Sequence, residues 1–310
     1  MKRSIAIFLL SSITAACLTS TPIVQSDKLL PQIHCRGNGK YTLVMDAGLG
    51  NWSLFYKPLA TPLSKTCRVC LIDRAGYTSS KVSAKARDAK TIALEIHQAL
   101  QQKDITKNII FTGHSLGGLH GRMYQALFPE EIKGMILIDA ANPNQLHQLP
   151  GEFWEMMQEQ KKSLEKTIKL AQRGFLKHAK SKIPTFNLPD SLLEEYFQTT
   201  TKAEYYFTTK AETEAFKQSL KQGSKLKDLG NLPLLVIGSS NSMNPEILRQ
   251  KGKNYPFRLH NKAWLQLQRE LSKLSSNATF VESKKDHYLH LTDTELVLKS
   301  ILTFINRIPE

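Results

Sequence analysis

The sequence predicts an α/β fold, with a mostly parallel sheet and helices on both of its faces. Six short apolar runs end in Gly, Asp, Asn or Ser, as strands buried on both faces do. Amphipathic stretches with helical spacing separate several of these runs, and such alternation is typical of parallel sheets. The 310 residues are enough for one large domain, or for a domain that carries an insertion.

Each predicted element follows from its composition and spacing. The strands are rich in Val, Ile, Leu and Phe, and the helices repeat apolar residues every three or four positions. The predicted strands fall within residues 41–48, 68–80, 108–113, 134–143, 232–241 and 278–287. The predicted helices span residues 83–102, 116–128, 260–274 and 294–308.

The alternation stops between residues 143 and 230, where Lys, Glu, Gln and aromatic residues are frequent. Helical spacing recurs at 153–176 and 191–200, and no strand pattern is evident. We expect residues 143–230 to form a helical cap over the carboxyl edge of the sheet. The core would then consist of residues 27–142 and 231–310. A lateral elaboration with no role at the site is the alternative.

The first 26 residues have the layout of an export signal. A basic start precedes an apolar stretch over residues 5–13, which is too short to span a membrane, and small residues follow. The residues before Cys17 also resemble a bacterial lipoprotein processing site, with Cys17 as the lipid-bearing first residue. We expect export from the cytoplasm, as a periplasmic, secreted or membrane-anchored protein.

Export gives the other three cysteines a structural meaning, because disulfides persist in oxidising compartments. Cys35, Cys67 and Cys70 allow at most one disulfide among them. The close pair Cys67 and Cys70 could also suggest a redox or metal site, but no second Cys or His pair stands at metal-site spacing. We expect a disulfide from Cys35, with its partner left open.

Composition limits the classes of partner. Hydrophobic content of 41% and charged content of 22% argue against wholesale disorder. The formal net charge of +15 favours association with anionic surfaces such as a membrane, so membrane association through this charge or a lipid anchor is open. No basic stripe carries interleaved aromatic residues, and we expect no nucleic-acid partner.

The stretch Gly113-His114-Ser115-Leu116-Gly117 fits the pattern G-x-S-x-G, between a predicted strand and a predicted helix. A sharp strand-to-helix turn crowds the positions two before and two after the serine, so both are glycine. The turn raises the hydroxyl above the sheet and leaves the first helical N–H groups free to bind an anion. A capping serine would need no flanking glycines. We therefore predict that Ser115 is a nucleophile.

Several segments around this turn resemble the α/β-hydrolase fold family, and specifically its lipase- and esterase-like members. The similar segments include MDAGLG, LIDRAGYTSS and GHSLGGLHGRMYQALFPEEIKGMILIDAANP, and the resemblance runs from about residue 30 to 309 apart from the insertion. It implies an eight-stranded, largely parallel sheet that needs no cofactor. It also implies a Ser–His–acid triad in the chain order Ser, acid, His.

The resemblance points to a base in the loop after the last predicted strand. The stretch HYLHL at residues 287–291 resembles a closing motif of the family whose first histidine is catalytic. By that match His287 is the base, and His290 supports the loop or caps the next helix as a hydrogen-bonded structural residue. His114, beside the nucleophile, is expected to pack under the turn.

The sequence offers more than one candidate for the acid of the triad. Its common position follows the run LPLLVIG, where no aspartate stands, and Asn241 cannot supply the negative charge that stabilises an imidazolium. One strand earlier the apolar run ends in Asp139, a place where some relatives keep their acid. We expect Asp139, with Glu246 as the alternative. A third reading has Asp139 only bracing the entry to the cap.

Acyl transfer also needs hydrogen-bond donors for the developing oxyanion. The resemblance implies the backbone N–H groups of Leu116 and Leu49, with Gly48 as the tolerant neighbour of Leu49. The segment 73–77 resembles a structural loop of the family, in which Thr78 here replaces a glycine.

Together these residues predict a serine hydrolase that cleaves carboxylic esters through an acyl-enzyme. A lactonase, thioesterase or amidase would share the same triad, and a catalytically silent envelope protein that binds lipid or a partner is the alternative from another class. The expected partner is a small ester, and aromatic residues of the cap favour an apolar one. These aromatics are Phe153, Trp154, Phe175, Tyr196, Phe197, Tyr205, Tyr206 and Phe207.

Overall fold

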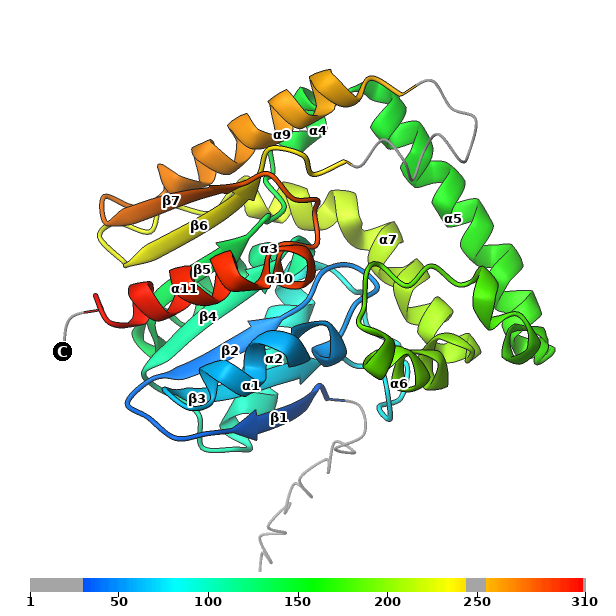
Figure 1. Cartoon of the computed structure of the whole chain (residues 1–310), viewed down its shortest axis with the longest axis horizontal. Helices are drawn as coiled ribbons and strands as arrows, with labels where there is room; N and C mark the ends of the chain where they lie inside the picture. Colours follow the sequence, from blue (N-terminus) through cyan, green and yellow to red (C-terminus); the bar gives the residue numbers. More distant parts are fainter. Residues whose placement is uncertain (1–29, 244–254, 309–310) are drawn as a thin grey trace, which may run out of the picture.

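The computed structural model describes residues 30–243 and 255–308, and these form a seven-stranded sheet between layers of helices (Figure 1). The strand order is β1-β3-β2-β4-β5-β6-β7, antiparallel only between β1 and β3. The strands are β1 (Gln32–Arg36), β2 (Thr42–Asp46), β3 (Arg68–Asp73), β4 (Ile109–His114), β5 (Ile132–Ile138), β6 (Leu234–Ser239) and β7 (Ala278–Ser283). All six predicted strands are present.

The strand count differs from the eight that the family resemblance implied. In the described ranges the sheet has seven strands, six from apolar runs and the edge strand β1. The apolar pattern missed β1 because only Ile33 of its five residues is buried. An edge strand has one neighbour and is largely exposed, so its sequence need not be apolar throughout.

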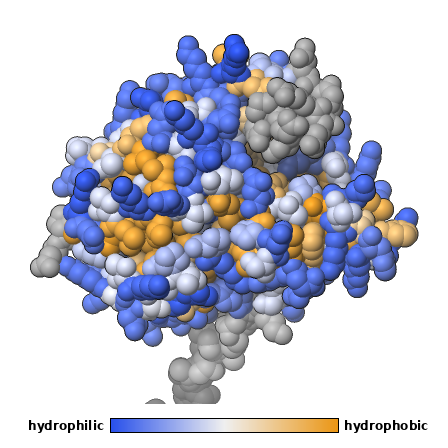
Figure 2. All heavy atoms as spheres, viewed as in Figure 1, coloured by the Kyte–Doolittle hydropathy of each residue, from blue (hydrophilic) through white to orange (hydrophobic). Residues whose placement is uncertain are grey.

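Helices cover both faces of the sheet. Apolar residues of α2 (Ala89–Gln101), α3 (Leu116–Leu127) and α9 (Phe257–Ser272) pack on one face. The other face packs against α1 (Lys57–Leu63) and α11 (Thr294–Ile305). Figure 2 shows the face of the molecule on which α11 lies, where apolar residues gather among hydrophilic ones. Short helical segments complete the core: η2 (Ser53–Tyr56), η3 (Pro129–Glu131) and α10 (Leu289–Thr292).

The segment 143–230 is described throughout and contains helices but no strand. Its helices are α4 (Gln145–Gln148), α5 (Gly151–Gln172), η4 (Phe175–His178), η5 (Lys180–Lys182), α6 (Asp190–Thr200) and α7 (Ala203–Gly223). Helix α7 contacts the loops that follow β2 and β3: a Cβ on Gly76 would lie 1.9 Å from Thr208 Oγ1. These helices therefore stand over the carboxyl ends of the strands (Figure 1).

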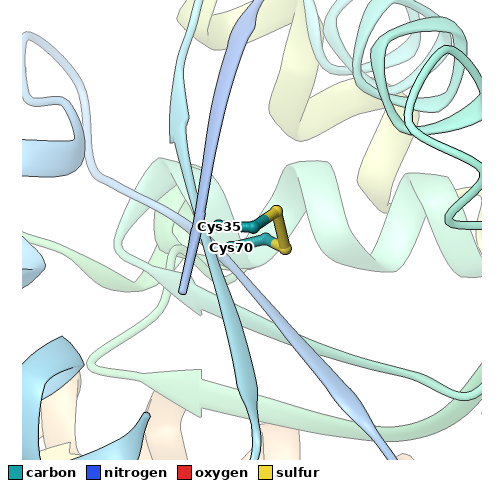
Figure 3. The surroundings of a disulfide bond; sticks show 2 residues. All are labelled: Cys35 and Cys70. Atoms are coloured by element: carbon teal, nitrogen blue, oxygen red, sulfur yellow. A yellow bond between two sulfur atoms is a disulfide. The ribbon is translucent and has the colours of Figure 1, made fainter. Parts of the chain in front are cut away.

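The disulfide expected from Cys35 joins it to Cys70 (Figure 3). The two residues face each other across the antiparallel pair β1 and β3, with their Cα atoms 4.1 Å apart. Cys67 stays a buried free thiol, and burial raises its pKa to about 11. The pairing fastens the edge strand to the sheet.

The expected export signal, residues 1–26 with Cys17, lies outside the described residues. In the ranges 30–243 and 255–308, the search for a helix with the length and apolar character to cross a bilayer found none.

Candidate active site

Ser115 occupies the sharp turn between β4 and α3. Its backbone angles, φ 51° and ψ −121°, lie in a region that side-chain-bearing L-residues rarely adopt. A Cβ on Gly113 would lie 2.4 Å from the backbone of Gly117, and a Cβ on Gly117 would lie 2.3 Å from the carbonyl oxygen of Asp46. The turn therefore admits only glycine at both flanking positions.

Backbone hydrogen bonds tie this turn to the end of β5. The Ser115 N–H donates to the Ile138 carbonyl at 3.1 Å, and the Ala141 N–H donates to the Ser115 carbonyl at 2.9 Å. Asp139 lies between these two contacts in the chain and has a positive φ of 43°. Ser115 and Asp139, two of the three predicted triad residues, thus both have a positive φ. The same pair of backbone hydrogen bonds holds their two segments together.

Asp139 and His287 are in direct contact. His287 Nδ1 is 2.6 Å from Asp139 Oδ2, while the Asp139 side chain is fully buried and that of His287 is 25% exposed. The Ser242 hydroxyl donates to the same carboxylate oxygen at 3.0 Å. The other oxygen, Oδ1, accepts from the Ser239 N–H and from Trp264 Nε1, both at 2.8 Å. Four donors thus surround a carboxylate that has no contact with solvent.

His287 also lies against the serine turn. His114, the neighbour of Ser115, is within hydrogen-bond distance of the His287 carbonyl through its Nε2, at 2.9 Å. The rings of His114 and His287 have centroids 4.6 Å apart. The structure therefore brings His287 to Asp139 and to the turn that holds Ser115, from three separate loops at the carboxyl edge of the sheet.

Three other histidines near His287 are held neutral. Burial, together with the nearby His287, lowers the pKa of His290 to about 3 and that of His260 to about 4. Burial, with His290 and His287 close by, also lowers the pKa of His114 well below its usual value. These three imidazoles therefore carry no charge at neutral pH.

His290 differs from its expected hydrogen-bonded role. Its side chain is fully buried, and within the described residues neither ring nitrogen has a hydrogen-bond partner. It packs instead against Tyr56 and His114, at centroid distances of 5.0 and 4.4 Å. The residue supports the site by packing.

The two predicted oxyanion donors both belong to segments next to Ser115. Leu116 is the first residue of α3, where an N–H group has no acceptor within the helix. Leu49 belongs to the loop after β2, and a Cβ on its neighbour Gly48 would lie 3.1 Å from Ser115 Cβ. This second loop therefore runs directly beside the predicted nucleophile.

Sequence reasoning missed the side chains that surround Asp139. Trp264 lies in the predicted helix 260–274 and Ser242 in the loop after β6, and neither position carried a recognisable signal. Their contacts span more than a hundred residues along the chain. Glu246, the alternative acid, lies outside the described residues. In the part of the chain that is described, no group of three or more His, Cys, Asp or Glu side chains could hold a metal ion.

Comparison with known proteins identifies the family of the fold. The sequence profile of the alpha/beta hydrolase fold matches residues 42–246, about two thirds of the chain. The chain belongs to the α/β-hydrolase fold family. The predicted fold class and the family resemblance are thereby confirmed, and a hydrolase activity accords with both.

The similarity to individual members is distant. The uncharacterized protein YbdG of Bacillus subtilis is 31% identical over 125 residues, which cover 40% of this chain and 38% of YbdG. A thermophilic esterase from Thermogutta terrifontis superposes with a TM-score of 0.64 at 15% identity, covering 90% of this chain and 93% of the esterase. An enol-lactonase from Burkholderia xenovorans gives a TM-score of 0.60 at 17% identity, covering 89% and 96%. The chain thus spans less than half the length of this curated relative, while the solved structures share its fold.

Proposed function

We propose that this α/β-hydrolase is a serine hydrolase of carboxylic esters. The observation that carries the proposal is the 2.6 Å contact between His287 and the buried Asp139, next to the strained turn that presents Ser115. Ser115 is the nucleophile, His287 the base and Asp139 the acid that orients the base. Leu116 and Leu49 supply backbone N–H groups to the oxyanion.

The geometry supports a two-step reaction. His287 Nε2 takes the Ser115 proton as Oγ attacks the ester carbonyl, and the negative charge that develops on the carbonyl oxygen meets the two N–H groups. Asp139 holds the Nδ1 proton of His287 and stabilises the imidazolium. The proton then passes to the leaving alcohol, and water releases the acid from the acyl-enzyme in a second cycle.

An apolar substrate is supported by aromatic side chains beside His287. The ring of Tyr288 lies 5.7 Å from that of His287 and 5.5 Å from that of His114. Phe186 of the cap and Phe55 extend this group, with centroids 5.1 and 6.1 Å from Tyr288. Apolar rings next to the reacting atoms favour an alkyl or aryl group on the acyl or alcohol side.

The deciding experiment measures hydrolysis of p-nitrophenyl esters of increasing chain length, together with labelling by a fluorophosphonate probe. Ser115→Ala should lose both activities and keep its melting temperature. Ser163→Ala, at an exposed serine of α5, should keep both. Full ester hydrolysis in Ser115→Ala would refute the proposed nucleophile.

The same assays separate the rival functions. A silent binding protein would neither label nor hydrolyse, although the buried acid beside His287 supports an active site. Lactones, thioesters and amides added to the panel would identify an activity that shares the triad with esterases.

We also propose that the chain is exported, because the pattern of residues 1–26 and the disulfide between Cys35 and Cys70 both fit an oxidising compartment. Cell fractionation tests this, with Cys17→Ser to test lipidation. If the protein is exported without a lipid on Cys17, Cys17→Ser and the wild type should appear in the same cell fraction. Lipidation is indicated if only the wild type stays with the membrane, and an uncleaved cytoplasmic protein would contradict export.

A further inference from the structure

The loop at residues 47–51, which we call the oxyanion loop, is held from behind by one buried arginine. Arg74, in the loop after β3, is fully buried. Its Nη1 donates to the Ala47 carbonyl at 2.8 Å, and its Nη2 donates to the carbonyls of Gly48 at 2.7 Å and Asn51 at 3.0 Å. Three of the five carbonyls in the loop thus bind the same guanidinium.

One of these contacts fixes the proposed oxyanion donor. The Gly48 carbonyl and the Leu49 N–H belong to a single planar trans peptide, so they point in opposite directions. Because the carbonyl faces Arg74, the Leu49 N–H faces away from it. A Cβ on Gly48 would lie 3.1 Å from Ser115 Cβ, which places this peptide beside the predicted nucleophile.

The cap supplies the counter-charge. Glu212, in the middle of α7, is fully buried, and its Oε1 accepts from Arg74 Nε at 2.8 Å. Its Oε2 accepts from the Gly50 N–H at 3.2 Å and from the Tyr77 hydroxyl at 2.8 Å. One carboxylate from the cap therefore contacts both the oxyanion loop and the arginine that holds it.

Helix α7 also packs closely on this loop. Gly50 has a φ of +75°, and a Cβ there would lie 3.2 Å from Thr209 Cγ2. Asp46, at the end of β2, binds Arg74 Nη1 at 2.6 Å and is 2.6 Å from His120 Nδ1, so the guanidinium is fixed from the core side as well. A shift of α7 would withdraw Glu212 from the loop and leave Arg74 held by the core alone.

We propose that Glu212 is a positioning residue through which the seating of cap helix α7 sets the geometry of the oxyanion loop. The proposal rests on the proposed function, since it assigns Glu212 to the support of the Leu49 donor. It predicts that the cap contributes to the chemical step as well as to substrate selection.

The test compares Glu212→Gln with the wild type in the full chain, using the best p-nitrophenyl ester. Oxyanion donors act mainly in the transition state, so kcat should fall by about tenfold or more while KM stays within about threefold. A trifluoromethyl ketone, whose serine adduct carries an oxyanion, should lose inhibition in parallel with the loss of kcat.

The chain offers a matched control. Glu95 of α2 is 2% exposed and accepts from the buried Arg87 at 2.7 Å, outside the oxyanion loop. Glu95→Gln removes the carboxylate of a similar buried pair, so it should lower the melting temperature but leave kcat and ketone inhibition unchanged. A purely structural role for Glu212 would make the two variants behave alike.

The outcomes distinguish this inference from the proposed function. A wild-type protein that neither labels nor hydrolyses contradicts the proposed function. An active wild type, with kcat of Glu212→Gln within twofold of Glu95→Gln, overturns the positioning role. If Glu212→Gln does not fold, Glu212→Asp, which shortens the side chain by one methylene, is judged by the same criteria.

Discussion

The two oxygens of the Asp139 carboxylate have different partners, and only one of them contacts the proposed base, His287. Oδ1 accepts from Ser239 N–H and Trp264 Nε1, whereas Oδ2 faces His287 and Ser242. An amide at this position can keep the contacts of Oδ1 through its own oxygen. It then presents an NH₂ group to His287, which disfavours the tautomer that the proposed base needs.

Asp139→Asn should therefore lower kcat by about three to four orders of magnitude without unfolding the protein. Steady-state kinetics and thermal melting measure the two effects. Ser242→Ala, which leaves the carboxylate in place, is the control and should cost far less. An Asp139→Asn variant with more than a tenth of the wild-type kcat would show that the acid lies elsewhere.

Acid should destabilise the fold through the buried His290. The pKa of this buried histidine is about 3 in the fold, against 6.5 in the unfolded chain. Because the folded value is lower, the unfolded chain binds more protons below pH 6.5, and the free energy of unfolding falls as the pH drops towards 3. At pH 5 the loss from one such group is about 2 kcal/mol.

His290→Phe removes this titration without breaking a hydrogen bond, since neither ring nitrogen has a partner among the described residues. Urea unfolding at pH 7 and pH 5 should show a smaller loss of stability in the variant. An equal loss in both proteins would mean that His290 does not titrate as the structure indicates.

At the scale of elements, the β4-to-α3 turn depends on space that only glycine leaves. A Cβ on Gly117 would meet backbone oxygens of Asp46 and Ala47 at 2.3 and 2.7 Å, and these belong to the end of β2 and the loop after it. Gly117→Ala should destabilise the fold by about 1–3 kcal/mol or more. Thermal melting should show a fall of several degrees.

Gly151→Ala is the matched control for that turn. Gly151 begins α5, and a Cβ there would have no atom within 4 Å. Its melting temperature should equal or slightly exceed that of the wild type, because alanine reduces the freedom of the unfolded chain. Equal melting temperatures for the two variants would contradict the close packing at Gly117.

For the whole molecule, the disulfide between Cys35 and Cys70 closes a loop across the first edge of the sheet, with a sequence separation of 35. Cross-linking a loop of this length restricts the unfolded chain and contributes about 2–4 kcal/mol. Cys35→Ser with Cys70→Ser should lose that amount in urea unfolding. Reductant should weaken the wild type and leave the double variant unchanged, whereas equal stability of both proteins would argue against a structural disulfide.

Aromatic packing also joins the core to the cap. Two aromatic residues of the core loops, Trp52 and Tyr77, pack on the cap. Trp52 stacks on Tyr196 at a centroid distance of 5.5 Å, and the ring of Tyr77 lies 5.9 Å from that of Tyr205. Together with Glu212, these contacts make the helices of residues 143–230 part of the site's surroundings.

The sequence by itself predicted six of the seven described strands and the sharp turn at Ser115. Apolar runs of strand length predicted β2 to β7, and Gly113 and Gly117 around Ser115 predicted a turn that the structure contains. These features depend on backbone and side-chain constraints within a few residues, so a short stretch of sequence specifies them. The edge strand β1 was not predicted, because its single buried residue gives no apolar pattern.

Only the tertiary structure decided which groups meet. Asp139 and His287 are 148 residues apart in sequence, and Glu212 and Arg74 are 138 apart. The sequence left the choice between Asp139 and Glu246 open, because the partner of His287 depends on which strand ends stand side by side at the carboxyl edge. Pairing β5 with β6, and β6 with β7, places Asp139 beside the His287 loop, and no local pattern encodes that order of strands.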